Sequence, residues 1–103
     1  MNYGIPESSM NIITQMMQST KEIEKAIIFG SRAIGNYKNG SDVDIAIFGD
    51  GITLEIVSEV SVKLNEELPL PYYFDILHYG SIKHEALKKH IDDFGKVFYS
   101  RSR

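Results

Sequence analysis

The chain has 103 residues, of which 43% are hydrophobic and 24% charged, and it carries a formal net charge of −3 and no cysteine. This balance is typical of one globular domain and argues against disorder, disulfides, thiolate chemistry and a protein that coats nucleic acid by charge alone. The first residues show no basic-then-apolar signal pattern, and no apolar run nears the length of a membrane span. We therefore expect a single cytoplasmic domain over residues 1–103, with no membrane contact and no direct nucleic-acid partner.

The first half of the chain is predicted to form one helix and two strands. Apolar residues at helical spacing indicate a helix that begins after Ser8 or Ser9. The run "KAIIFG" (25–30) indicates a buried strand, and "SDVDIAIF" (41–48) shows the alternation of a second strand. Between them, residues 31–40 are rich in Gly and Asn, which predicts a loop that follows a single helical turn.

The second half is predicted to form two helices and two strands. A helix follows Thr53, its candidate cap, and the aromatic run "YYFDILHY" (72–79) indicates a third strand. The last helix is expected to be capped by Ser81 and stopped by Gly95, before a short strand over 96–100. This order of elements predicts a compact α/β or α+β fold, in which helices pack on a sheet of about four strands.

Three acids are the candidate metal ligands. Side chains alternate faces along a strand, so Asp42 and Asp44 are expected on one face, where their like charges call for a cation. Mg²⁺ suits such a site, because it prefers carboxylate and phosphate oxygens. Asp75 lies in the third predicted strand, and it completes a three-carboxylate cluster if that strand lies beside the second. Such a cluster could hold two metal ions for an in-line displacement at phosphorus.

The turn that precedes these acids is the candidate phosphate site. Gly30 permits close approach of the backbone to a ligand, and Ser31 offers a hydroxyl and an N–H group at the start of the helical turn. Arg32 adds a fork of donors that suits a phosphate. Each part alone also has a purely structural interpretation, since most Gly-Ser turns are only turns.

The three histidines are not predicted to bind zinc. His78, His84 and His90 share no face with a third ligand, so we expect ordinary polar or half-buried side chains.

The ordered pattern resembles a known family. The chain has a hydrophobic-Gly-Ser turn, then ten residues, then the pattern Asp-hydrophobic-Asp-hydrophobic. This pattern resembles the signature of the DNA polymerase β-like nucleotidyltransferase superfamily. The segment "FGSRAIG…SDVDIAIF" looks most like the minimal nucleotidyltransferases of that superfamily, and "FDIL" is similar to its third acidic strand. Ile34 departs from the pattern, because many relatives have a polar or basic residue there.

The resemblance implies a mixed-sheet catalytic domain that binds a nucleoside triphosphate, with ATP as the substrate, and two Mg²⁺ ions. Gly30 and Ser31 would contact the phosphates, and Asp42 and Asp44 would hold both metals. Asp75 would bind the catalytic metal and help to deprotonate an acceptor hydroxyl. That hydroxyl would attack the α-phosphorus, and pyrophosphate would leave.

The resemblance also implies a partner. Relatives that act on drugs or RNA carry an additional acceptor domain, and nothing follows Arg103, so we expect another chain, or another copy of this one, to hold the acceptor. Minimal members commonly pair with a HEPN-type helical toxin, act as its antitoxin and transfer AMP to a toxin tyrosine. Two alternatives stay open: a non-catalytic antitoxin that covers its partner, and nucleotidyl transfer to a small molecule.

Overall fold

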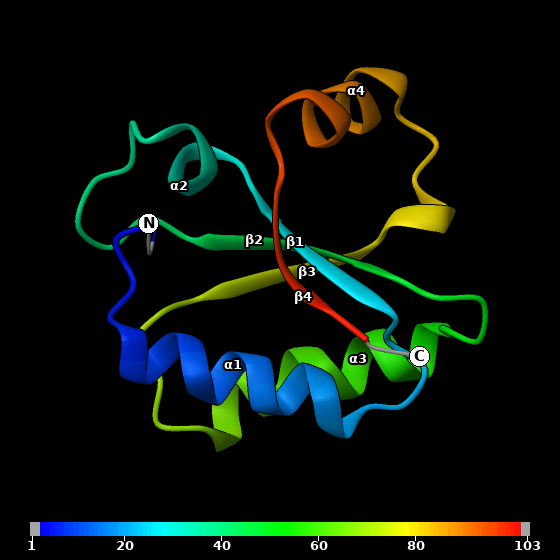
Figure 1. Cartoon of the computed structure of the whole chain (residues 1–103), viewed down its shortest axis with the longest axis horizontal. Coiled ribbons are helices and arrows are strands. Elements are labelled where there is room, and N and C mark those ends of the chain that lie inside the picture. Colours follow the sequence, from blue (N-terminus) through cyan, green and yellow to red (C-terminus); the bar gives the residue numbers. More distant parts are fainter. Residues whose placement is uncertain (1–2, 102–103) are drawn as a thin grey trace.

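Four strands form one mixed sheet at the centre of the structure, a computed structural model that describes residues 3–101 (Figure 1). The strand order is β3-β2-β1-β4. Strand β1 pairs antiparallel with both β2 and β4, whereas β2 and β3 run parallel. The strands are β1 (Lys25–Phe29), β2 (Val43–Phe48), β3 (Phe74–His78) and β4 (Lys96–Ser100).

The helices lie on both faces of the sheet (Figure 1). A parallel pair needs a crossover connection, and α3 with its π-helical extension supplies the one between β2 and β3. The helical elements are α1 (Glu7–Ser19), α2 (Ser31–Ile34), α3 (Leu54–Val62), the π-helix Lys63–Glu67, the 3₁₀ helix Tyr79–Ser81 and α4 (Glu85–Phe94). The predicted α/β or α+β fold with a mixed four-stranded sheet is therefore confirmed.

The two faces of the sheet are packed differently. Helices α1 and α3 cover one face, where Val43, Ile45 and Ile47 of β2 join the larger hydrophobic core. On the opposite face α4 contributes Ile91 to a smaller buried cluster, which includes Ala46 of β2. Alternation along β2 thus directs its even-numbered side chains, Asp44 among them, toward the α4 side.

Two predicted helix starts were wrong. Helix α1 begins at Glu7 rather than after Ser8 or Ser9, and it has no side-chain cap. Helix α4 is capped by His84, whose ring Nδ1 accepts the Leu87 N–H, while Ser81 lies in the preceding 3₁₀ turn. These errors share a cause, because several polar residues near each helix start can act as a cap and tertiary packing selects the start.

The second strand is also shorter than predicted. It begins at Val43 instead of residue 41, so Asp42 lies just outside the strand. The predicted cap Thr53 and the predicted stop Gly95 are confirmed, since Thr53 Oγ1 accepts the Ile56 N–H and Gly95 ends α4. None of the helices within residues 3–101 has the length and hydrophobicity needed to span a bilayer.

Candidate active site

Two of the predicted acids lie side by side on neighbouring strands. Strands β2 and β3 pair in parallel, and Asp44 and Asp75 are direct partners in that register. Residues directly opposite in a ladder place their Cβ atoms on the same face and about 5 Å apart. Asp44 is half-buried and Asp75 is exposed, so the pair lies at the boundary between the sheet and solvent.

The third acid acts on this pair electrostatically. Asp42 is exposed and precedes β2, but its charge still reaches Asp44. Burial, the Asp75 carboxylate and the Asp42 carboxylate, in that order, raise the pKa of Asp44 from 3.8 to about 6, while His90 opposes the change. The fold therefore concentrates negative charge at one point on the surface of the sheet.

The predicted glycine turn packs directly on Asp44. Gly30 lies directly between β1 and α2 and has φ 76° and ψ −157°, a conformation that only glycine adopts readily. A Cβ atom at this position would overlap the Asp44 carboxylate, so a side chain here would displace that carboxylate as well as strain the backbone. Ser31 begins α2 immediately afterwards, and the turn thus borders the acids as predicted from the sequence.

A histidine that was not predicted to take part fixes this turn. The Gly30 N–H donates to Nε2 of His90, on α4, over 3.0 Å. The His90 ring lies edge-on to Phe29, at 6.1 Å between centroids, and contacts Phe94 at 5.5 Å. Gly30 and His90 are sixty residues apart, so no local pattern in the sequence could reveal this contact.

Arg32 does not occupy the predicted phosphate position. Its side chain is only 3% exposed, and its guanidinium donates to the main-chain oxygens of Ser41 and Tyr3. The sequence carries no signal of this burial, because the direction of the Arg32 side chain depends on how α2 packs on the rest of the protein. A phosphate contact by this guanidinium would require these hydrogen bonds to break.

A family profile settles the relationship that the motif indicates. The profile described as "Polymerase beta, Nucleotidyltransferase" matches residues 11–103. The chain belongs to the polymerase β nucleotidyltransferase family. Among curated proteins there is no significant match to the sequence of this nucleotidyltransferase.

Solved structures share the fold of this nucleotidyltransferase. A toxin–antitoxin crystallised with AMP-PNP has a TM-score of 0.74 and 21% identity, over 90% of this chain and 74% of that one. The MntA–HepT toxin–antitoxin has a TM-score of 0.71 and 18% identity, over 93% of this chain and 74% of that one. A candidate nucleotidyltransferase from Sulfolobus solfataricus has a TM-score of 0.57 and 20% identity, over 90% and 78% of the two chains. At these identities the likeness establishes the fold alone.

The acids of this nucleotidyltransferase suit a metal that is shared with a nucleotide. Within residues 3–101, no group of three acidic or histidine side chains is placed to hold an ion, so Asp42, Asp44 and Asp75 do not by themselves form the predicted three-carboxylate site. Mg²⁺ rarely uses such a site, because it retains waters and binds one or two carboxylates together with substrate phosphates. Burial and then repulsion from Asp75 and Asp42 raise the Asp44 pKa, and a bound cation would relieve that repulsion. The donor set thus fits Mg²⁺ held jointly by carboxylates and phosphates.

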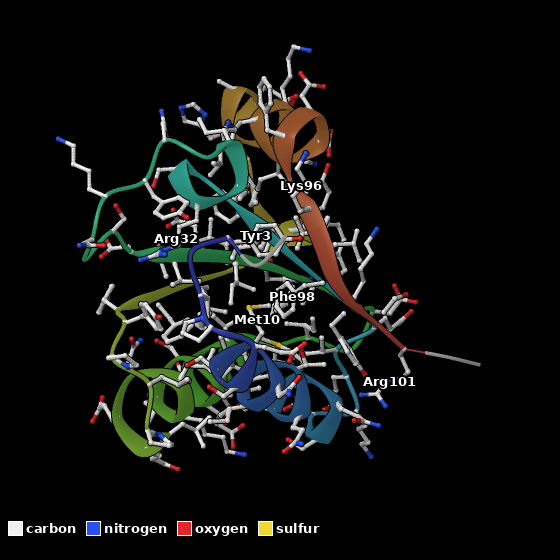
Figure 2. The ribbon with its side chains drawn as sticks, turned by 60° about the vertical axis from the view of Figure 1, so that its left-hand side comes forward. Tyr3, Met10, Arg32, Lys96, Phe98 and Arg101 are labelled. Carbon is white, nitrogen blue, oxygen red and sulfur yellow. The ribbon has the colours of Figure 1, made fainter. Side chains whose placement is uncertain are left out.

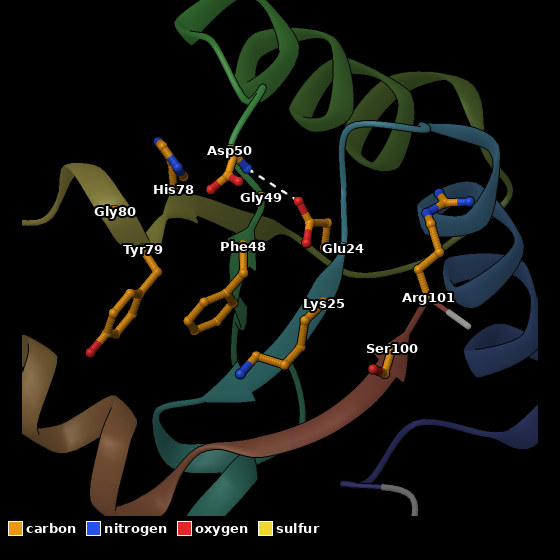
Figure 3. Close-up of a pocket in the computed structure, with 10 residues that line it drawn as sticks. All are labelled: Glu24, Lys25, Phe48, Gly49, Asp50, His78, Tyr79, Gly80, Ser100 and Arg101. Carbon is orange, nitrogen blue, oxygen red and sulfur yellow. Dashed lines mark hydrogen bonds between the residues drawn. The ribbon is translucent and has the colours of Figure 1, made fainter. Parts of the chain in front are cut away.

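A separate hollow lies at the other end of the strands (Figure 3). It has a volume of about 480 Å³ and includes Lys25, the first residue of β1, and Phe48, the last residue of β2. Phe48 is four residues, or about 13 Å of strand, from Asp44. Because this hollow contains none of the predicted site residues, we place the candidate active site at the acids instead.

Proposed function

We propose that this protein is an Mg²⁺-dependent adenylyltransferase that transfers AMP from ATP to a tyrosine hydroxyl of a HEPN-type partner toxin, and so acts as an antitoxin in the cytoplasm. The observation that carries the proposal is the parallel register of Asp44 with Asp75, beside a glycine turn that packs on Asp44. This arrangement places carboxylates from two strands next to backbone that can approach a triphosphate.

Each part of the site has a defined task in the proposed reaction. Gly30 and Ser31 would border the triphosphate, and Asp42 and Asp44 would hold the metals, with Asp75 as a further ligand. Bound Mg²⁺ would neutralise charge on the phosphates and on the leaving pyrophosphate. Asp75 is exposed, as a group that meets an acceptor must be.

The proposed transfer is a single displacement. The acceptor oxygen forms a bond to the α-phosphorus while the bond from that phosphorus to the bridging oxygen of the β-phosphate breaks. Asp75 takes the hydroxyl proton, and the bond electrons leave with pyrophosphate. The products are an AMP ester of the acceptor and pyrophosphate, so no oxidant or further reactant is needed.

The choice of partner rests on the structural relatives. Two of them are toxin–antitoxin structures, one with AMP-PNP and one of MntA with HepT. Their fold extends over at least 90% of this chain. Because of this shared fold, we propose a toxin partner and an ATP substrate for this chain as well.

The decisive experiment measures the mass of the acceptor. The chain is co-expressed with a HEPN-type helical toxin, and the purified pair is incubated with ATP and Mg²⁺. Intact-mass analysis should show AMP-sized additions to the partner, and peptide mapping should locate them on tyrosine. Asp75→Asn should remove the additions, whereas Asp93→Asn, an exposed acid on α4 paired with Lys89, should retain them.

Two results would overturn parts of this proposal. Neutralisation of the toxin by an Asp42→Asn, Asp44→Asn, Asp75→Asn triple variant would show that the protein acts by covering its partner. Transfer of AMP to a small hydroxyl compound in the absence of any partner would assign a different acceptor. Unchanged transfer by Asp75→Asn alone would remove the role given to that acid.

A further inference from the structure

The buried Arg32 side chain connects three segments that surround the acids. Its Nε and Nη2 donate to the main-chain oxygen of Ser41 over 3.1 and 2.9 Å, and its Nη1 donates to that of Tyr3 over 3.1 Å. Figure 2 shows Arg32 and Tyr3 on the same side of the molecule. A guanidinium presents its donors in a fixed planar fork, so these bonds define the positions of both carbonyls.

Two aromatic rings hold the guanidinium in place. The carbon at its centre lies 5.0 Å from the centroid of the Tyr37 ring and 5.1 Å from that of Tyr72. Tyr72 belongs to the segment that leads into β3, two residues before the strand begins. Arg32 therefore links the segment before β2 with the segment before β3, the two strands that carry Asp44 and Asp75.

Asp42 is the acid that depends on this connection. Asp44 and Asp75 belong to the β-ladder, whereas Asp42 lies between Ser41 and the first residue of β2. On its C-terminal side the chain is held by the Val43 N–H, which donates to the Tyr73 oxygen over 2.9 Å. On its N-terminal side the Ser41 carbonyl receives two of the bonds from Arg32.

We propose that Arg32 is a positioning residue, which acts through the Ser41 carbonyl to hold Asp42 where it can share a metal with Asp44. This inference rests on the proposed function, because it assigns the metal to these acids. In this role the Arg32 guanidinium stays bonded to main-chain oxygens and would contact neither the nucleotide nor the metal. A lysine at this position would keep the charge but could not make the paired bonds to Ser41.

A second arginine supplies a matched control. Arg101 also donates to main-chain oxygens, those of Ile23, Gln18 and Thr20, at distances between 3.0 and 3.1 Å. Its guanidinium likewise lies over an aromatic ring, 5.8 Å from the centroid of Tyr99. Arg101 follows β4, and it lines the hollow at the end of the sheet opposite the acids (Figure 3).

The experiment compares Arg32→Lys with Arg101→Lys in the full chain. Binding of Mn²⁺ in the presence of AMP-PNP is followed by electron paramagnetic resonance, and AMP transfer is measured in parallel. Arg32→Lys should weaken Mn²⁺ binding about 10–100-fold, the usual cost of removing a group that orients a metal ligand. Arg101→Lys should leave Mn²⁺ affinity within about threefold of the wild type, even if both variants unfold more easily.

A double variant tests whether Arg32 acts through Asp42. In an Asp42→Asn background, Arg32→Lys should weaken Mn²⁺ binding by no more than about threefold, because residues that act as a unit are not additive. If Arg32→Lys does not fold, Tyr37→Leu can replace it, because it removes one of the two rings that hold the guanidinium, at a partly exposed site. It should weaken Mn²⁺ binding in the same direction, but less than Arg32→Lys.

The inference and the proposed function fail in different ways. The role of Arg32 would be overturned if folded Arg32→Lys bound Mn²⁺ as tightly as the wild type. It would also be overturned if Arg101→Lys lost as much Mn²⁺ affinity as Arg32→Lys. A full additional loss from Arg32→Lys in the Asp42→Asn background would do the same. Absence of AMP transfer by a wild-type chain that binds Mn²⁺ and AMP-PNP would instead overturn the proposed reaction and leave the Arg32 comparison intact.

Discussion

Asp44 and Ile45 are neighbours in β2, yet they lie on opposite faces of the sheet and serve opposite purposes. Ile45 is 1% exposed and lies in the core that α1 and α3 cover. Asp44 is half-buried on the face that carries α4, beside two further acids. The face with Ile45 maximises the burial of apolar area, whereas the face with Asp44 keeps charge at a site that protein atoms only partly enclose.

This contrast means that Ile45 stabilises the fold, whereas the ionised Asp44 carboxylate reduces its stability. Burial of an aliphatic side chain contributes about 1.5–3 kcal/mol. A carboxylate whose pKa is raised to about 6 is less favourably solvated in the folded chain than in the unfolded chain at neutral pH. Such a cost is expected at a site that is built to receive a cation.

The largest predicted effect is the loss of activity in Asp44→Asn. AMP transfer should fall by about 10²–10³-fold, the usual cost of removing one electrostatic group at a reaction centre. Without metal, the free energy of unfolding at pH 7 should rise, because the partly buried charge of Asp44 and its repulsion from Asp75 and Asp42 are removed. Initial rates and urea unfolding measure the two quantities, with Asp50→Asn, an exposed loop acid, as the control. A variant that loses stability together with activity would contradict the contrast between the faces.

The matching change on the other face is Ile45→Ala. It should lower the free energy of unfolding by about 2–5 kcal/mol, because it leaves a cavity in a packed core. AMP transfer per folded molecule should stay close to that of the wild type, as determined by active-site titration at a temperature below the unfolding transition. If Ile45→Ala were as stable as the wild type but catalysed AMP transfer more slowly, the core face would also contribute to catalysis, and the contrast between the two faces would fail.

The smallest predicted effect is a pH dependence of stability in the absence of metal. The folded pKa of Asp44, about 6, exceeds its ordinary value of 3.8, so the folded chain binds the proton more tightly. The associated stability is fully present below pH 3.8 and is lost as the pH rises through about 6. After discounting for solvent screening we expect about 1 kcal/mol. The free energy of unfolding is measured against pH for the wild type and for Asp44→Asn, and the difference between the two profiles isolates the Asp44 contribution. A difference (wild type minus variant) that rises with pH would contradict a raised Asp44 pKa.

The sequence indicated the main parts of the candidate site before the structure did. The ten-residue spacing between Ser31 and Asp42 and the alternation around Asp44 predicted a glycine turn followed by an acidic strand. Both are local features, and short-range sterics and hydrophobic periodicity specify them. The position of Asp75 in a third strand was predicted equally well. Its place beside Asp44 was predicted only on the condition that the third strand lies next to the second.

The supporting contacts could not be predicted in the same way. Arg32 was expected to contact a phosphate and instead donates to Ser41 and Tyr3. His90 was expected to be an ordinary polar or half-buried residue, and it is half-buried, but its bond to the Gly30 N–H was not predicted. Each contact depends on where a side chain points after distant segments have packed. Composition and periodicity carry no information about that direction.

The sequence by itself determined which residues are candidates for the chemistry, because strand alternation and the Gly-Ser turn are properties of a few consecutive residues. Only the tertiary structure decided that they meet. The parallel register of β2 and β3 brings Asp75 to Asp44, and α4 brings His90 to Gly30. These contacts join residues that are distant along the chain, and they form only where packing of the sheet and helices compensates for the entropy of closing long loops.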